Sequence, residues 1–268
     1  MRLRTIAVNT FGLFLRDRLL IIFGVVFLCV VLLMTTPLLF MKSQRTASNM
    51  LNMQAYVLQT VSMMMSMVSG AGSLLAAWAA ADGLVSEMKS GTILAVMARP
   101  VKRWEFLLGK YLGVLLLMAF YVVMMFLVSL LLAWMGGQKI AVATWPLLLL
   151  YPMVRYAIYA AIAMAIGTLL HPIFTWAVTL LLGVLAAMVV PRDPRVTNPL
   201  RWVESGLYYL LPSTHFLSED RFLDIKHASL RQASWFEHLT TLAYGMDYAA
   251  VVLLVAIWSF HYRSLKRD

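Results

Sequence analysis

Charged side chains and cysteine are both scarce in this sequence. Charged residues make up 13% of the chain and hydrophobic residues 62%, and the mean hydropathy is +0.82. So little polar surface cannot cover a soluble globule. The single cysteine, Cys29, lies inside an apolar run, which excludes a disulfide framework or a cysteine-rich metal site within one chain. The composition therefore predicts an all-α, polytopic integral membrane protein.

Two familiar segments are also missing. The N-terminus lacks the short apolar core and small-residue cleavage site of a removable signal peptide, so we expect the first apolar run to stay in the protein. No Gly-x4-Gly-Lys-[Ser/Thr] loop is present: Gly109-Lys110 is followed by Tyr111, and no glycine lies five residues before Gly109. We therefore expect this chain to bind no nucleotide, and we predict no catalytic residues, metal or cofactor in it.

Long apolar runs are abundant, and each is compared with the roughly 20 residues that a spanning helix needs. Six such runs predict six transmembrane helices in a single permease-like domain, 1–268: 19–40, 57–81, 111–135, 146–170, 173–190 and 242–262. Residues 1–18 mix arginines with apolar side chains at helical spacing, which predicts an interfacial helix. The segment 191–241 is predicted to lie outside the cell and to contain two short amphipathic helices.

The basic residues indicate the orientation. The net charge is +10, and the lysines and arginines cluster at the ends of apolar runs, where anionic lipid headgroups lie. We therefore expect membrane lipid, and no nucleic acid, as the partner of these charges. The short loops on one side hold most of the basic residues, so both termini are predicted to be cytoplasmic, in a bacterial cytoplasmic (inner) membrane.

Residues 87–105 form a short polar interruption between the second and third predicted spans. Ser90 can cap a short helix, and the pair Arg99-Pro100 must end it, because the residue before proline is pushed out of helical geometry. This coupling segment, 87–105, is predicted to be a small amphipathic helix at the cytoplasmic surface, a suitable shape for docking to a soluble partner.

The same segment resembles a known family. The run Glu87, Gly91-Thr92, Arg99-Pro100-Val101, Arg103 and Gly109-Lys110 is similar to a pattern found in permeases of the type-2 class of ATP-binding-cassette exporters. The layout of the whole chain is also similar, most of all to the compact six-span subgroup that includes the permease of copper-enzyme maturation in nitrous oxide reduction.

The resemblance implies a transmembrane permease of an exporter, acting as a homodimer or with a similar permease. Two copies of a separate ATPase subunit would bind ATP and Mg, and an extracytoplasmic protein could be a further partner. By the same resemblance, ATPase coupling would fall to these residues: Glu87, Gly91, Thr92, Arg99, Pro100 and Arg103. Two other classes stay open, namely a non-transporting mechanosignalling dimer coupled to an ATPase, and a membrane-embedded enzyme.

Two ionisable residues fall inside predicted spans, Arg155 in the fourth and Asp247 in the sixth. An ionisable group in hydrocarbon usually faces a cavity or a partner. We predict that they either form an intramembrane ion pair, which could be purely structural, or line a translocation path. The methionines near residues 63–67 are interpreted as packing and not as a copper path. The histidines and carboxylates of 215–227 are interpreted as solvated loop residues.

Overall fold

The computed structural model describes residues 2–17, 22, 24–25, 29, 66–85, 87, 102–135, 145–188, 206–207, 210–217, 223–224, 229–230 and 235–262. Within these ranges the fold is helical. The helices are α1 (Arg2–Leu15), a helix over Ser66–Val85, α5 (Arg103–Met135), α6 (Trp145–Gly167), α7 (Pro172–Met188) and α9 (Trp235–Tyr262), with a 3-10 turn, η2 (Thr214–Leu217). Two-residue strands, β1 (Leu223–Asp224) and β2 (Ser229–Leu230), pair antiparallel.

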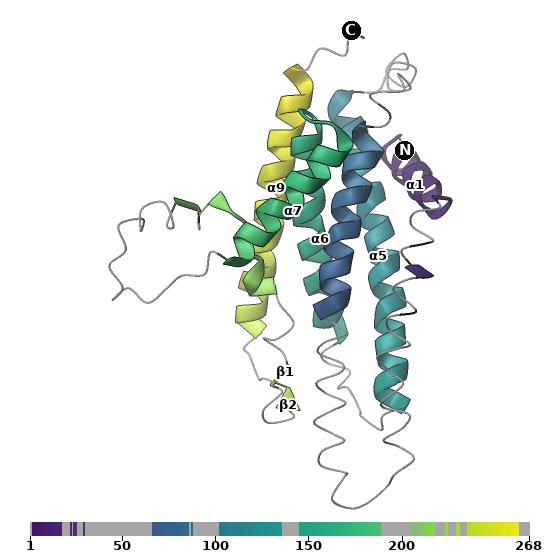
Figure 1. The fold of residues 1–268 in the computed structure, drawn as a ribbon, viewed down its shortest axis with the longest axis vertical. Coiled ribbons are helices and arrows are strands. Elements are labelled where there is room, and N and C mark those ends of the chain that lie inside the picture. The colour runs from purple at the N-terminus through teal and green to yellow at the C-terminus, as the bar shows by residue number, and fades with distance from the viewer. Residues whose placement is uncertain are drawn as a thin grey trace, which may run out of the picture.

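Four of these helices are long and apolar enough to cross a membrane. They run over Ser66–Val85, Arg103–Val128, Leu149–Gly167 and Trp235–Tyr262. The long helices run side by side along the longest dimension of the molecule, and α1 lies at the end where α9 finishes (Figure 1). The strands β1 and β2 lie toward the opposite end. These described helices fit the multi-pass helical membrane protein that the composition predicted.

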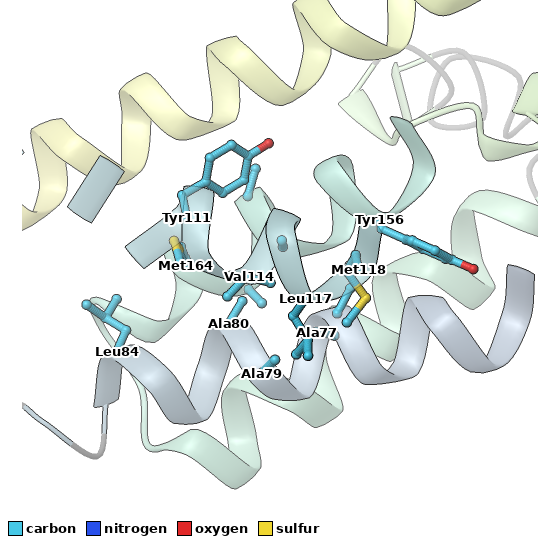
Figure 2. Close-up of a cluster of buried hydrophobic side chains, with 14 of the residues drawn as sticks. Ala77, Ala79, Ala80, Leu84, Tyr111, Val114, Leu117, Met118, Tyr156 and Met164 are labelled. Atoms are coloured by element: carbon cyan, nitrogen blue, oxygen red, sulfur yellow. The ribbon is translucent and has the colours of Figure 1, made fainter. Parts of the chain in front are cut away.

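The helix Ser66–Val85 forms the centre of the packing because its contact face is built from alanine. Its alanines from Ala76 to Ala81 are at most 1% exposed. Small side chains let neighbouring helices approach closely in a membrane, where packing and not burial from water holds helices together. Leu117 and Met118 of α5 and Met164 of α6 fill the space against this face (Figure 2).

A second cluster joins α6 to α9. It contains Tyr151, Ile158 and Ala249, with Leu217 of η2 covering it. Gly245 lets α9 approach α6, since a methyl group there would lie 2.3 Å from Cγ1 of Val154. The polar edge of this contact is a 3.0 Å hydrogen bond between the Tyr151 hydroxyl and Nδ1 of His238.

Several sequence-based expectations differ from the structure in their boundaries. The helix α5 starts at Arg103, eight residues before the apolar run, and α9 starts at Trp235, seven residues before its run. The second amphipathic helix expected before residue 241 is therefore the first part of α9. The first predicted span, 19–40, and most of the segment 191–241 lie outside the described residues.

Candidate functional site

The site is the base of the coupling segment, where the chain leaves and re-enters the helical bundle at Glu87 and Arg103. The helix α5 begins there with a cap. The backbone N–H of Lys102 donates to Oε2 of Glu105 at 3.1 Å, which is one half of a capping box. A carboxylate in the first turn also favours the positive end of the helix dipole. The start of α5 is therefore fixed by Glu105, within the polar segment.

Arg103 connects this start to the end of α9. Its Nη1 donates to the carbonyl oxygen of His261 at 2.9 Å and to that of Phe260 at 3.5 Å. The last carbonyls of a helix have no partner inside the helix, and a cation there also opposes the negative end of the dipole. Residues far apart in the sequence are thus tied together by one guanidinium.

Glu87 is held on the other side of the base. Its Oε1 lies 2.5 Å from Nζ of Lys110, which is on α5 two helical turns after Arg103. The Lys110 side chain is 6% exposed and that of Glu87 24%. Partial burial makes the attraction stronger than at an exposed surface, and removing one partner would leave a charge in a poorly solvated place. The chain entering the coupling segment is therefore anchored to α5.

The helix α1 packs against α5 beside this ion pair. A methyl group at Gly109 would lie 2.7 Å from Cγ2 of Ile6, and one at Gly113 would lie 2.6 Å from Cβ of Thr10. Both pairs are spaced four residues apart, so Ile6 and Thr10 on one helix meet Gly109 and Gly113 on the other. This small-x3-small contact lets the two backbones approach closely.

A pocket of about 280 Å³ opens between α1, the helix Ser66–Val85 and α5. Its lining residues are Thr10, Leu13, Phe14, Arg16, Asp17, Asp82, Gly83, Glu87 and Lys110. The wall carries charges of both signs, and both Asp17 and Lys110 act electrostatically on Asp82. The base of the coupling segment is thus a polar junction of three helices, with α9 joined to it through Arg103.

The structure places only part of the predicted coupling set. Glu87 and Arg103 are described and lie at the two ends of the segment. The remaining members, Gly91, Thr92, Arg99 and Pro100, lie outside the described residues, as does the short helix expected around them. The coupling role of all six residues stays a prediction.

Arg155 and Asp247 are not brought together as an ion pair within the described part of one chain. Nη1 of Arg155 donates to Oγ of Ser69 at 3.1 Å, whereas Asp247 is exposed on α9. The buried face of α9 includes Gly245 and Ala249. At about 100° per residue, Asp247 points about 200° away from Gly245. The two residues lie at a similar depth, but their side chains point in different directions. That either residue lines a translocation path stays a prediction.

Sequence reasoning missed the partners of the two anchoring residues. Lys110 belongs to the run that resembles the family pattern, but nothing in the sequence pairs it with Glu87. The signal that could have located α1 was the spacing of Gly109 and Gly113, which is the four-residue spacing of close helix contacts. Among the described side chains, no group of three or more histidines, cysteines or carboxylates is placed to hold a metal ion.

The helices of spanning length fit a multi-pass membrane protein. Residues 4–265 match the family model described as ABC-2 family transporter protein. Because this match covers nearly the whole chain, the protein belongs to the ABC-2 transporter family. A comparison with curated proteins finds no significant match.

Proposed function

We propose that this chain is the permease subunit of an ATP-driven exporter in a bacterial cytoplasmic membrane, working as a homodimer with two copies of a separate ATPase. The family match over residues 4–265 supports a permease that works with an ATPase partner. The observation that carries the coupling part of the proposal is the anchoring of both ends of the coupling segment, at Glu87 and Arg103, to the helical bundle.

Anchoring matters because a docking element transmits motion only if its base is stiff. Displacing the segment pulls on the helix Ser66–Val85 and on α5 through the Glu87–Lys110 pair. It also pulls on α9 through Arg103. Packed helices tend to shift as rigid bodies and not to deform continuously. Closure of a docked ATPase would therefore tilt several helices together, with ATP and Mg bound by the partner.

We further propose six spans with both termini in the cytoplasm. Four helices of spanning length support this arrangement. The helix α7 has 17 residues, about 26 Å at 1.5 Å per residue, which is close to the thickness of the hydrocarbon core. The predicted first span, 19–40, supplies the sixth. This arrangement puts α1 and the coupling segment on the cytoplasmic side, where α1 would lie as an interfacial helix.

Co-purification with a co-expressed ATP-binding-cassette ATPase tests the proposal. Arg99→Glu should abolish association, because it reverses a charge on the predicted docking element. Arg103→Gln should retain the ATPase but reduce its stimulation, because it removes the guanidinium that ties α5 to α9. Arg4→Gln, an exposed change on α1, serves as the control. A stoichiometric, fully stimulated ATPase with Arg99→Glu would contradict the docking assignment.

Transport itself needs a separate measurement. ATP-dependent solute movement in sealed vesicles containing both subunits is expected for an exporter. A complex that hydrolyses ATP without moving solute would point to the mechanosignalling alternative. If the isolated chain, without the ATPase, chemically converted a membrane substrate into a product, the result would point to a membrane enzyme.

A further inference from the structure

Arg155 lies close to the middle of a helix of spanning length. It is ten residues after Trp145, the first residue of α6, which places it about 15 Å along the helix at 1.5 Å per residue. Counted from Leu149, where the stretch of spanning hydropathy begins, the position is about 9 Å along. On either count a hydrocarbon core about 30 Å thick would enclose it. A charge at this depth is costly and usually has a partner or a water-filled cavity.

The described part of the chain satisfies this guanidinium only in part. Nη1 donates to Oγ of Ser69, and this is its one hydrogen bond among the described residues. Nε is buried and has no acceptor in the part of the chain that the structure describes, although a guanidinium carries five N–H donors. The side chain as a whole is partly exposed, so it can be reached from outside the packed core.

The chain also offers few carboxylates to neutralise this charge. The sequence contains no aspartate or glutamate between Asp17 and Asp82, so neither the predicted first span nor the helix containing Ser69 can supply one at this depth. Asp247 is at a similar depth on α9 but is exposed and forms no ion pair with Arg155. No carboxylate in the described part of the chain therefore neutralises Arg155.

We propose that Arg155 binds an oxyanion, a carboxylate or a phosphate, of the amphipathic molecule that this permease moves. The inference rests on the proposed function and adds a substrate class to it. A guanidinium is suited to this task because its planar donors match the geometry of carboxylate and phosphate oxygens. Ser69, which is fully buried, is a positioning residue that holds Nη1 and leaves the accessible N–H groups of the guanidinium for the ligand.

Thermal unfolding of the isolated chain in phosphatidylcholine nanodiscs tests this, with dodecyl phosphate as the probe and dodecanol as the neutral match. Dodecyl phosphate should raise the unfolding midpoint in a concentration-dependent way, and dodecanol should not. Arg155→Gln should weaken the apparent affinity about tenfold or more, the loss expected for a charge-assisted hydrogen bond. Arg155→Lys should retain part of the response, because it keeps the charge but loses the planar fork.

Two controls separate this site from general charge effects. Arg4→Gln removes an exposed cation of α1 and should leave the response unchanged. Ser69→Ala should weaken binding less than Arg155→Gln does. Nanodiscs containing phosphatidylglycerol, without the probe, show whether a resident lipid can be the source of the oxyanion. A rise there that Arg155→Gln removes supports the same site with lipid as its ligand.

Several results would overturn the proposal. An equal response to dodecanol, or an undiminished response with Arg155→Gln, would show that no oxyanion binds here. The main rival is an ion pair between Arg155 and Asp247 of a second copy. In that case Asp247→Asn would destabilise as much as Arg155→Gln, and the exchange Arg155→Asp with Asp247→Arg would restore stability. Since the ATPase is absent, failure here leaves the proposed function standing.

Discussion

The contact between α1 and α5 leaves no room for one extra methyl group. In Gly113→Ala the new Cβ would lie 2.6 Å from Cβ and 2.8 Å from Cγ2 of Thr10, and 3.0 Å from the backbone oxygen of Ala7. Ordinary contacts of such atoms are about 3.5–4.0 Å. Neither Cβ of Thr10 nor a backbone oxygen can rotate away, so α1 must move outward by roughly 1 Å.

The expected cost of this overpacking is about 1–3 kcal/mol. Alanine also has a better helix propensity than glycine, by about 1 kcal/mol. That gain does not enter the docking equilibrium, because α5 is helical whether α1 is docked or not. At 1–3 kcal/mol the fraction of undocked α1 rises about 5–150-fold. Hydrogen exchange of the amides of residues 2–15, measured in nanodiscs, should accelerate by that factor.

Gly12→Ala is a matched control that should change the hydrogen exchange of α1 in the opposite direction. Gly12 is on α1, and a methyl group there meets nothing within 4 Å. The substitution should therefore stabilise α1 by up to about 1 kcal/mol through helix propensity alone and slow its exchange. If Gly113→Ala leaves α1 as protected as in the unmodified chain, or if both variants shift exchange in the same direction, the proposed docking contact is wrong.

Two further predictions concern thermal unfolding. Glu87→Ala should cost about 1.5–3 kcal/mol, because it leaves the nearly buried Lys110 without its carboxylate partner. The double variant Glu87→Ala/Lys110→Met should cost less than the sum of the two single changes; strict additivity would show that the pair has no coupling energy. Gly245→Ala should lower the free energy of unfolding by about 1 kcal/mol. This is the cost of overpacking α9 against α6, partly offset by the better helix propensity of alanine. In Gly70→Ala the new methyl group meets nothing within 4 Å, so this control should not lower the free energy of unfolding.

The helices themselves were largely predictable from the sequence, whereas their ends were not. Apolar runs locate the part of a helix that faces lipid, but backbone hydrogen bonding continues past it into polar residues. The helix α5 starts at Arg103 because Glu105 caps it. The helix α9 starts at Trp235, which places His238 inside the helix, beside Tyr151. A hydropathy window predicts neither of these helix starts, because both depend on local hydrogen bonds and on tertiary contacts.

The site was predictable as a segment and not as a set of contacts. The charges of residues 87–110 could be read directly, but the pairing of Glu87 with Lys110 depends on how two helices pack. The contact of Arg103 with His261 joins residues 158 positions apart, and no local pattern encodes it. For Arg155 and Asp247 the depth along each span could be predicted from the sequence. The direction in which each side chain points could not, because that depends on how the helices pack.

The packing offers a physical route by which the proposed coupling segment would act at a distance. The helix Ser66–Val85 ends beside Glu87, and its alanines from Ala76 to Ala81 are almost fully buried. Figure 2 shows Ala77, Ala79 and Ala80 beside Leu117 and Met118. Close-packed interiors transmit displacement because they have few voids to absorb it. The same helix carries Ser69, which holds Arg155. One rigid element therefore connects the anchored base, at its Glu87 end, to the proposed oxyanion site near its other end.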